Sequence, residues 1–124
     1  MEKIPCAIAV VDDEEAVRRA LLRLLKASGL RARAYESAED FLANWRSDPP
    51  DCVVLDLHMP GLNGLELMQC LQRLDARLAF VVITAHDETA MRARCLDAGA
   101  SAYLCKPLDE RTLLTAIENA CAAP

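Results

Sequence analysis

Five polar residues of this sequence stand at the carboxyl ends of apolar runs, and their types could cooperate in one site. They are two adjacent acids, a third acid, a hydroxyl and an amine: Asp12, Asp13, Asp56, Thr84 and Lys106. Three carboxylates a few ångströms apart repel each other by several kcal/mol per pair. One amine cannot neutralise three such charges, whereas a divalent cation with oxygen ligands can. Mg²⁺ is the abundant cation of this kind, so the pattern predicts a magnesium site.

Asp56 is the best-placed nucleophile of this set. An aspartate in contact with the metal can attack a phosphoryl group, while the cation, Lys106 and the Thr84 hydroxyl stabilise the transferring oxygens. Taken singly, each residue has an ordinary explanation: Asp13 could cap the helix that follows, and a threonine that ends a strand can reflect β-propensity. Together, at the ends of the first, third, fourth and fifth runs, they favour the functional interpretation.

The elements that must position these residues alternate along the chain. Short apolar runs predict five strands, the second of them weak: Ile4–Val11, Arg31–Tyr35, Cys52–Leu57, Leu78–Thr84 and Ser101–Cys105. Helical spacing, caps and glycine or proline stops predict five helices: Glu14–Ser28, Ala38–Arg46, Gly64–Leu74, Asp87 to just before Gly99, and Asp109–Cys121.

Strands and helices that alternate in this way predict an α/β fold with parallel strands and right-handed crossovers. We expect one domain over residues 1–124, a doubly wound, five-stranded sheet in the order 2-1-3-4-5. In such sheets the site lies outside the carboxyl ends of the strands, at the switch point between the first and third strands. Asp12, Asp13 and Asp56 fall at that point.

Composition excludes several classes of protein. With 53% hydrophobic and 27% charged residues, the chain is neither disordered nor dependent on disulfides for its core. No apolar run is long enough to cross a bilayer, and the start lacks the features of a signal peptide, so we expect a cytoplasmic protein without membrane contact. A net charge of −5 argues against direct nucleic-acid binding.

The six cysteines show no metal-binding spacing. None forms a Cys-x-x-Cys pair or has histidines near it at zinc spacing. Five lie in apolar runs or on apolar helix faces, which favours reduced, buried side chains in the core over a redox role. The six are Cys6, Cys52, Cys70, Cys95, Cys105 and Cys121.

Four segments resemble the receiver (phosphoacceptor) domains of bacterial two-component response regulators, and the resemblance covers essentially the whole chain. The segments are VVDDEEAVRRALLRLL, DCVVLDLHMPGLNGLEL, FVVITAHD and CLDAGASAYLCKPLD. The resemblance implies that a phosphohistidine on a sensor histidine kinase phosphorylates Asp56. It is strongest to the FixJ-type regulators, in which a helix-turn-helix domain follows, although this chain contains no such segment.

The same resemblance implies roles for individual residues. Asp13 would bind Mg²⁺ directly and Asp12 through water, with Asp56 and the backbone carbonyl of His58 as further ligands. Lys106 would contact the phosphoryl group and join the next residue, a proline, by a cis bond. In the family's switch pair, matched here by Thr84 and Tyr103, the hydroxyl moves to the phosphate and the ring turns inward. This reshapes the face formed by the fourth helix, fifth strand and fifth helix.

The details that vary within the family include two histidines. His58 and His86 stand two residues beyond the phosphoacceptor and the switch threonine, positions that flank the phosphoryl group in the family. They are candidate modulators of hydrolysis or solvent-facing loop residues. His58 also argues against an aspartate-nucleophile phosphohydrolase, which needs a second acid at that place. A flavodoxin-like carrier is disfavoured because the aspartates after the first strand would repel a flavin phosphate.

The output is open at this stage. Phosphorylation would repack the helix around Met91–Leu96 against the Tyr103 strand, and the mixed charges there would suit a two-fold interface. We therefore expect either a phosphorylation-dependent homodimer or control of a DNA-binding domain. A stand-alone phosphorelay receiver is the alternative. No enzymatic activity is expected beyond phosphorylation from a donor and autodephosphorylation.

Overall fold

A five-stranded parallel sheet forms the centre of the computed structural model, which describes residues 6–74 and 76–122. Its order is β2-β1-β3-β4-β5, as predicted. The first predicted strand is shorter than expected because Cys6 lies outside it, and its residues Ile4 and Pro5 lie outside the described part. The strands are β1 (Ala7–Val11), β2 (Arg31–Tyr35), β3 (Cys52–Asp56), β4 (Ala79–Thr84) and β5 (Ala102–Cys105).

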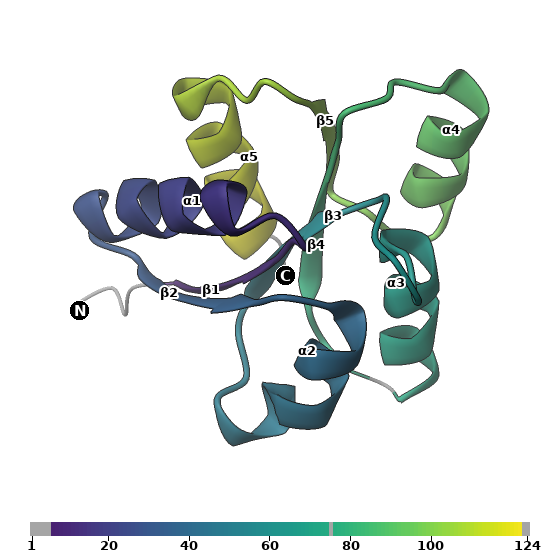
Figure 1. Ribbon diagram of the computed structural model, residues 1–124, viewed down its shortest axis with the longest axis horizontal. Coiled ribbons are helices and arrows are strands. Elements are labelled where there is room, and N and C mark those ends of the chain that lie inside the picture. The colour runs from purple at the N-terminus through teal and green to yellow at the C-terminus, as the bar shows by residue number, and fades with distance from the viewer. Residues whose placement is uncertain (1–5, 75, 123–124) are drawn as a thin grey trace.

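Helices cover both faces of the sheet (Figure 1). α1 (Glu15–Ala27) and α5 (Glu110–Ala122) lie on one face, and α2 (Ala38–Asn44), α3 (Gly64–Arg73) and α4 (Thr89–Asp97) on the other. Strand residues point alternately to the two cores. In β3, for example, Val54 belongs to the α1/α5 core and Val53 and Leu55 to the α2/α3/α4 core. The central strands are therefore apolar on both sides, which is typical of parallel sheets.

Helices α1 and α4 begin later in the structure than the sequence predicts, and α3 begins as predicted. α1 begins at Glu15 instead of Glu14, so its N-cap residue is Glu14 and not Asp13. α4 begins at Thr89 instead of Asp87 because the backbone at Glu88 is extended. α3 begins as predicted, since Asn63 and Glu66 form a capping box. None of the helices in the described ranges is long and apolar enough to cross a membrane.

The second helix ends two residues earlier than predicted. α2 stops at Asn44, and a 3₁₀ turn (Trp45–Ser47) follows before the two prolines. Phe41 is fully buried in the core as expected, and it lies between Tyr35 and Trp45 with ring-centroid distances of 5.1 and 6.5 Å. This aromatic group fixes α2 against the end of β2.

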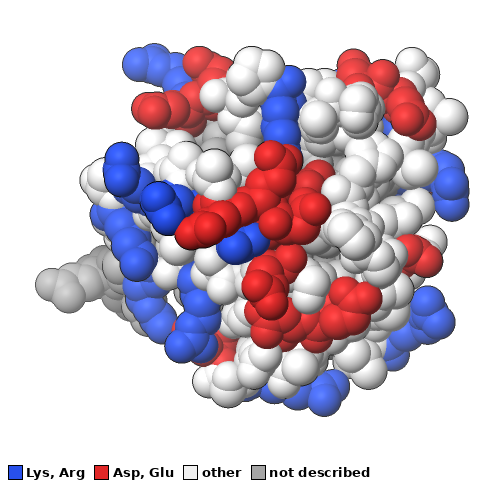
Figure 2. Space-filling model, in the orientation of Figure 1, with Lys and Arg blue, Asp and Glu red and all other residues white. Residues whose placement is uncertain are grey.

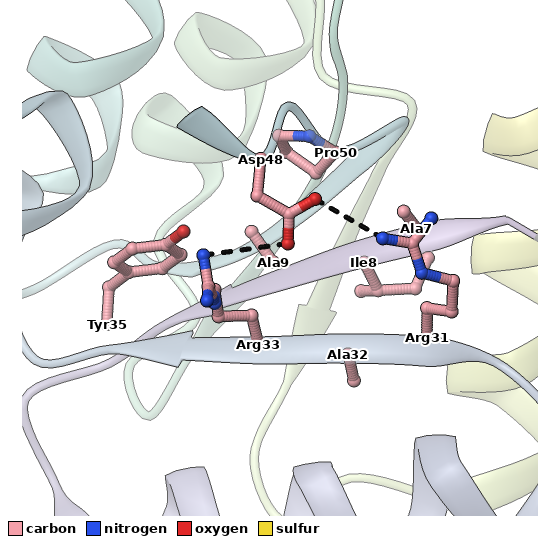
Figure 3. Close-up of a pocket in the computed structure, with 9 residues that line it drawn as sticks. All are labelled: Ala7, Ile8, Ala9, Arg31, Ala32, Arg33, Tyr35, Asp48 and Pro50. Atoms are coloured by element: carbon pink, nitrogen blue, oxygen red, sulfur yellow. Dashed lines mark hydrogen bonds and ion pairs between the residues drawn. The ribbon is translucent and has the colours of Figure 1, made fainter. Parts of the chain in front are cut away.

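The edge strand β2 was the weakest of the predicted strands, and its charges explain why. Its arginines alternate with partly buried alanines. Arg31 and Arg33 reach Asp48 at 3.3 and 3.6 Å across a shallow pocket (Figure 3). Charged residues on an edge strand discourage pairing with other chains. The polar pattern of β2 is therefore that of a solvated edge.

The cysteines correct the expectation of six reduced thiols. Cys6, just before β1, and Cys121, in the last turn of α5, form a disulfide with a Cα–Cα distance of 6.5 Å. Their sequence separation of 115 residues hid this pairing. Cys105 is exposed rather than in the core, whereas Cys52 and Cys95 are buried as expected. Burial raises the pKa of Cys52 to about 12, so its thiol is unreactive.

We expect the Cys6–Cys121 bond to stabilise the fold because it links the two ends of the described chain. A loop of this length should add about 2 to 5 kcal/mol to the free energy of unfolding. Urea unfolding of the oxidised and dithiothreitol-reduced protein measures the difference. The difference should vanish in Cys6→Ser and persist in Cys105→Ser; equal stability of the two redox forms of the wild type contradicts the pairing.

Candidate functional site

Four acids meet at the carboxyl edge of the sheet. One carboxylate oxygen from each of Asp12, Asp13, Glu14 and Asp56 lies within 4.8 Å of the others. Asp12 follows β1 and is fully buried, whereas Asp56 ends β3 and is 4% exposed. Acidic side chains gather at the centre of the face in Figure 2, where β1 leads into α1 in Figure 1. The structure thus brings the three predicted acids together.

Glu14 is a member of this cluster that the sequence analysis missed. The sequence predicts Glu14 at the start of a helix, and its position directly after two acids is the signal that points to the cluster. The side chain of Asp12 turns the chain here, because its Oδ1 accepts a hydrogen bond of 2.9 Å from the Glu14 amide. That bond forms a local turn that brings the three consecutive acidic side chains close together.

Lys106 is the amine of the site. It follows β5, and its Nζ lies 3.1 Å from Asp12 Oδ2 and 3.6 Å from both Asp56 Oδ2 and Glu14 Oε1. Burial acts to lower the pKa of Lys106, but the hydrogen bond to Asp12 and the neighbouring carboxylates outweigh it and raise the pKa. The ammonium is therefore held in its charged form. Its bond to Pro107 is cis, as the resemblance implied.

Asp56 is the acid whose ionisation is most disfavoured. Burial and the charge of Asp12 raise its pKa from 3.8 to about 6, against the opposing effects of Lys106 and of the His58 amide, which donates to Asp56 Oδ1 at 3.2 Å. Protein groups alone thus leave this carboxylate under-compensated. A bound cation would remove that deficit.

The donor set fits Mg²⁺. Carboxylate oxygens are the ligands that this hard cation prefers, with water completing its shell. The carbonyl of His58, the fourth expected ligand, accepts no hydrogen bond from the described residues. A carbonyl without a partner among these residues, two positions after the under-compensated Asp56, is an arrangement that a cation can use.

The hydroxyl of Thr84 lies at the end of β4 and is fully buried. In this structure it donates to the His86 carbonyl at 3.0 Å and receives the His86 amide at 3.1 Å. These bonds form a local turn that presents the His86 ring. The rings of His58 and His86 meet edge to face with centroids 5.8 Å apart, and both are exposed. The two histidines therefore lie together at the mouth of the site.

Tyr103 departs from the implied starting position. The resemblance implied a ring that turns inward on phosphorylation, but here the ring is already buried at 4% exposure in the α2/α3/α4 core, with the Arg92 guanidinium 5.6 Å from its centroid. Burial raises the pKa of Tyr103. The nearby backbone of Glu88 acts to lower the pKa of Tyr103 and partly offsets the effect of burial. The Tyr103 hydroxyl nevertheless has no hydrogen-bond partner among the described residues.

The raised pKa of Asp56 predicts a pH-dependent penalty in metal-free protein. The folded state keeps the Asp56 proton up to about pH 6, whereas the unfolded state loses it near 3.8, so stability falls as pH rises through this window. With a chelator present, Asp56→Asn should raise the thermal midpoint at pH 7.5 and lose this advantage near pH 4. The surface control Asp97→Asn should show no such trend; a pH-independent effect of Asp56→Asn contradicts the assignment.

Known proteins resemble this chain throughout its length. FixJ of Azorhizobium caulinodans, a transcriptional regulatory protein, is 35% identical over 116 residues, 94% of this chain and 54% of FixJ. The response regulator MprA of Mycolicibacterium vanbaalenii is 41% identical over 90% of this chain and 48% of MprA. The chain thus spans about half the length of the curated relatives it matches.

Solved structures also resemble this chain, and a protein family matches it. The crystal structure of FixJ-N has a TM-score of 0.90 at 33% identity, with 98% of each chain covered. The response regulator StyR has a TM-score of 0.87 at 37% identity, covering 95% of this chain and 60% of StyR. The family described as the response regulator receiver domain matches residues 8–118. The chain belongs to the receiver domains of two-component response regulators and is of the FixJ type.

Proposed function

We propose that Asp56 accepts a phosphoryl group from a phosphohistidine on a sensor histidine kinase. The observation that carries this proposal is the arrangement around Asp56: an acid at the end of the central strand with Lys106 Nζ 3.6 Å from its Oδ2 and three further carboxylates beside it. A nucleophile needs a charged partner for the oxygens it receives, and Lys106 is in reach.

The chemical step transfers one group between two residues. An oxygen of Asp56 attacks the phosphorus, the P–N bond to the donor histidine breaks, and the imidazole leaves with the electron pair. Lys106 stabilises charge on the transferring oxygens, and the Thr84 hydroxyl gives up its His86 bonds to join it. Mg²⁺, when held by Asp12, Asp13, Asp56 and the His58 carbonyl, supplies the remaining neutralisation of charge.

Two further features belong to the same proposal. His58 and His86 flank the phosphoryl group and govern the access of water to it, because their rings meet at the mouth of the site. The chain catalyses no reaction on a separate substrate: the place where a phosphohydrolase holds its second acid is occupied by His58. The product is a phosphorylated protein that acts as a signal.

The output would act through the α4–β5–α5 face. Met91 and Leu104 are partly buried there and Leu96 is 42% exposed, which leaves an apolar surface for a partner. We propose a second copy of the chain or a DNA-binding domain as that partner. The relatives' regulatory names and their additional length support the second.

An apolar groove beside the site suits the kinase. It lies between α1 and the start of α5, and its lining residues include Lys106 of the site itself. A donor histidine must approach Asp56 across this edge, so a kinase helix that fills the groove would bring its histidine to the site. The exposed residues Ala16 and Ala20 mark the α1 side of the groove.

The primary test is phosphorylation by acetyl phosphate with Mg²⁺. The wild type should gain one acid-stable, base-labile group of phosphoryl mass on Asp56, Asp56→Asn should gain none, and Lys106→Ala should be labelled about 100-fold more slowly because a charged stabilising group is lost. Intact mass and peptide mapping measure this. Full labelling of Asp56→Asn would sink the assignment.

A second test separates docking from chemistry. Ala20→Glu places a charge in the groove without touching the acids, so phosphotransfer from a histidine kinase should slow at least tenfold while labelling by acetyl phosphate stays within twofold. The same substitution at Ala27, exposed at the far end of α1, is the control. Equal losses with both donors would place the effect in the site rather than in docking.

A further inference from the structure

Helix α2 contacts the loop that follows the proposed phosphoacceptor. Glu39 Oε2 accepts a hydrogen bond of 3.1 Å from the backbone amide of Leu62 in the β3–α3 loop. The same carboxylate lies against the Cα of Gly61, so closely that a Cβ there would overlap it. The Leu62 amide lowers the pKa of Glu39, which keeps the carboxylate ionised and the bond charge-assisted.

The helix side of this contact is well anchored. α2 is fixed by the Ser37 side chain, which accepts from the Asp40 amide at 2.9 Å, and by the buried residues Ala38 and Phe41. Glu39 lies in the first turn of this helix, so its backbone cannot move without displacing the core. Its exposed side chain therefore reaches the loop from a fixed backbone position.

Core packing holds part of the loop, because Leu57 and Met59 are buried and Leu62 packs against the same core, but its backbone hydrogen bonds lie mainly at its ends. At the start, the Leu57 amide donates to the Ile83 carbonyl at 2.8 Å. At the end, the Gly64 amide donates to the Leu57 carbonyl at 3.0 Å, and a Cβ at Gly64 would lie only 2.8 Å from the carbonyl oxygen of Asp56. Between these anchors, over residues 59–62, the bond to Glu39 is the only hydrogen bond to another element among the described residues.

We propose that Glu39 is a positioning residue that holds the β3–α3 loop so that the His58 carbonyl faces the acid cluster. This inference rests on the proposed function of the site. The chain of contacts runs from the core through α2 and Glu39 to Leu62, and from there along the loop to His58. Loss of the bond leaves the middle of the loop with only its packing contacts, so its backbone is less closely held and the His58 carbonyl is less precisely positioned.

The bond to Leu62, rather than the negative charge, carries the effect. Gln at position 39 keeps an oxygen acceptor without the charge, whereas Ala removes both. Glu36 offers a matched control because it is an exposed acid three residues away that makes no side-chain hydrogen bond to the described residues. If the negative charge acted at long range, Mg²⁺ affinity would fall in both Glu39→Ala and Glu36→Ala. If the position of the loop matters, the affinity falls only in Glu39→Ala.

The experiment is a Mg²⁺ titration followed by backbone amide NMR shifts in the wild type, Glu39→Ala, Glu39→Gln and Glu36→Ala. Removing an outer contact that orients a metal ligand typically weakens affinity about tenfold or more. We expect this loss in Glu39→Ala, with Glu39→Gln and Glu36→Ala within threefold of the wild type. The chemical shift of the Leu62 amide should differ between Glu39→Ala and the wild type before any metal is added. The thermal midpoints of all four proteins should agree, which shows that the fold is intact in each.

The outcomes separate this inference from the function on which it rests. Wild-type Mg²⁺ affinity in Glu39→Ala, or an equal loss in Glu36→Ala, overturns the positioning role while acetyl phosphate still labels Asp56. Failure of Asp56 labelling in the wild type overturns the proposed function instead.

Discussion

Repulsion between carboxylates at one edge of the sheet is the constraint on which this structure depends. Asp12 and Asp56 are almost fully buried, and two further acids lie within 4.8 Å, yet among the described residues Lys106 supplies the one ammonium that pairs with them. Burying like charges opposes folding, and the raised pKa of Asp56 is the mark of that cost. Such a site persists only where the surrounding structure holds it, and it gains stability from a bound cation that offsets the negative charge.

The sheet supplies that hold. Every strand that carries a site residue is paired on both sides or, in the case of β5, is paired to β4 and packed between α4 and α5. The last residues of β3 and β4 pair in register with Ile83 and Cys105, so the backbones of Asp56 and Thr84 are fixed by ladder hydrogen bonds. Lys106 is tied in the same way, because its amide donates to the Thr84 carbonyl at 2.7 Å. Only side chains and loops remain free to respond to a charge.

Features that depend on local sequence pattern and on strand order could be predicted from the sequence. Apolar runs identified the strands, and the parallel order then required Asp12, Asp56 and Lys106 to meet, as the structure shows. The sequence was insufficient for contacts between distant residues: Cys6 with Cys121, and Glu39 with Leu62, leave no periodic or motif signal. Side-chain rotation was also hidden, since the same Tyr103 sequence suits a ring in solvent or in the core.

The buried ring of Tyr103 is the part of the proposed switch pair whose energetics the structure describes most directly. Its buried hydroxyl lacks a partner among the described residues, a cost of about 1 to 3 kcal/mol. Ring burial and the contact with Arg92 offset that cost, the latter by roughly 0.5 to 1 kcal/mol at an exposed cation. In the proposed function these opposing terms would set the balance between the buried ring and an exposed one. A shift of the Thr84 hydroxyl away from His86 then needs to contribute only about 1.4 kcal/mol to change their ratio tenfold.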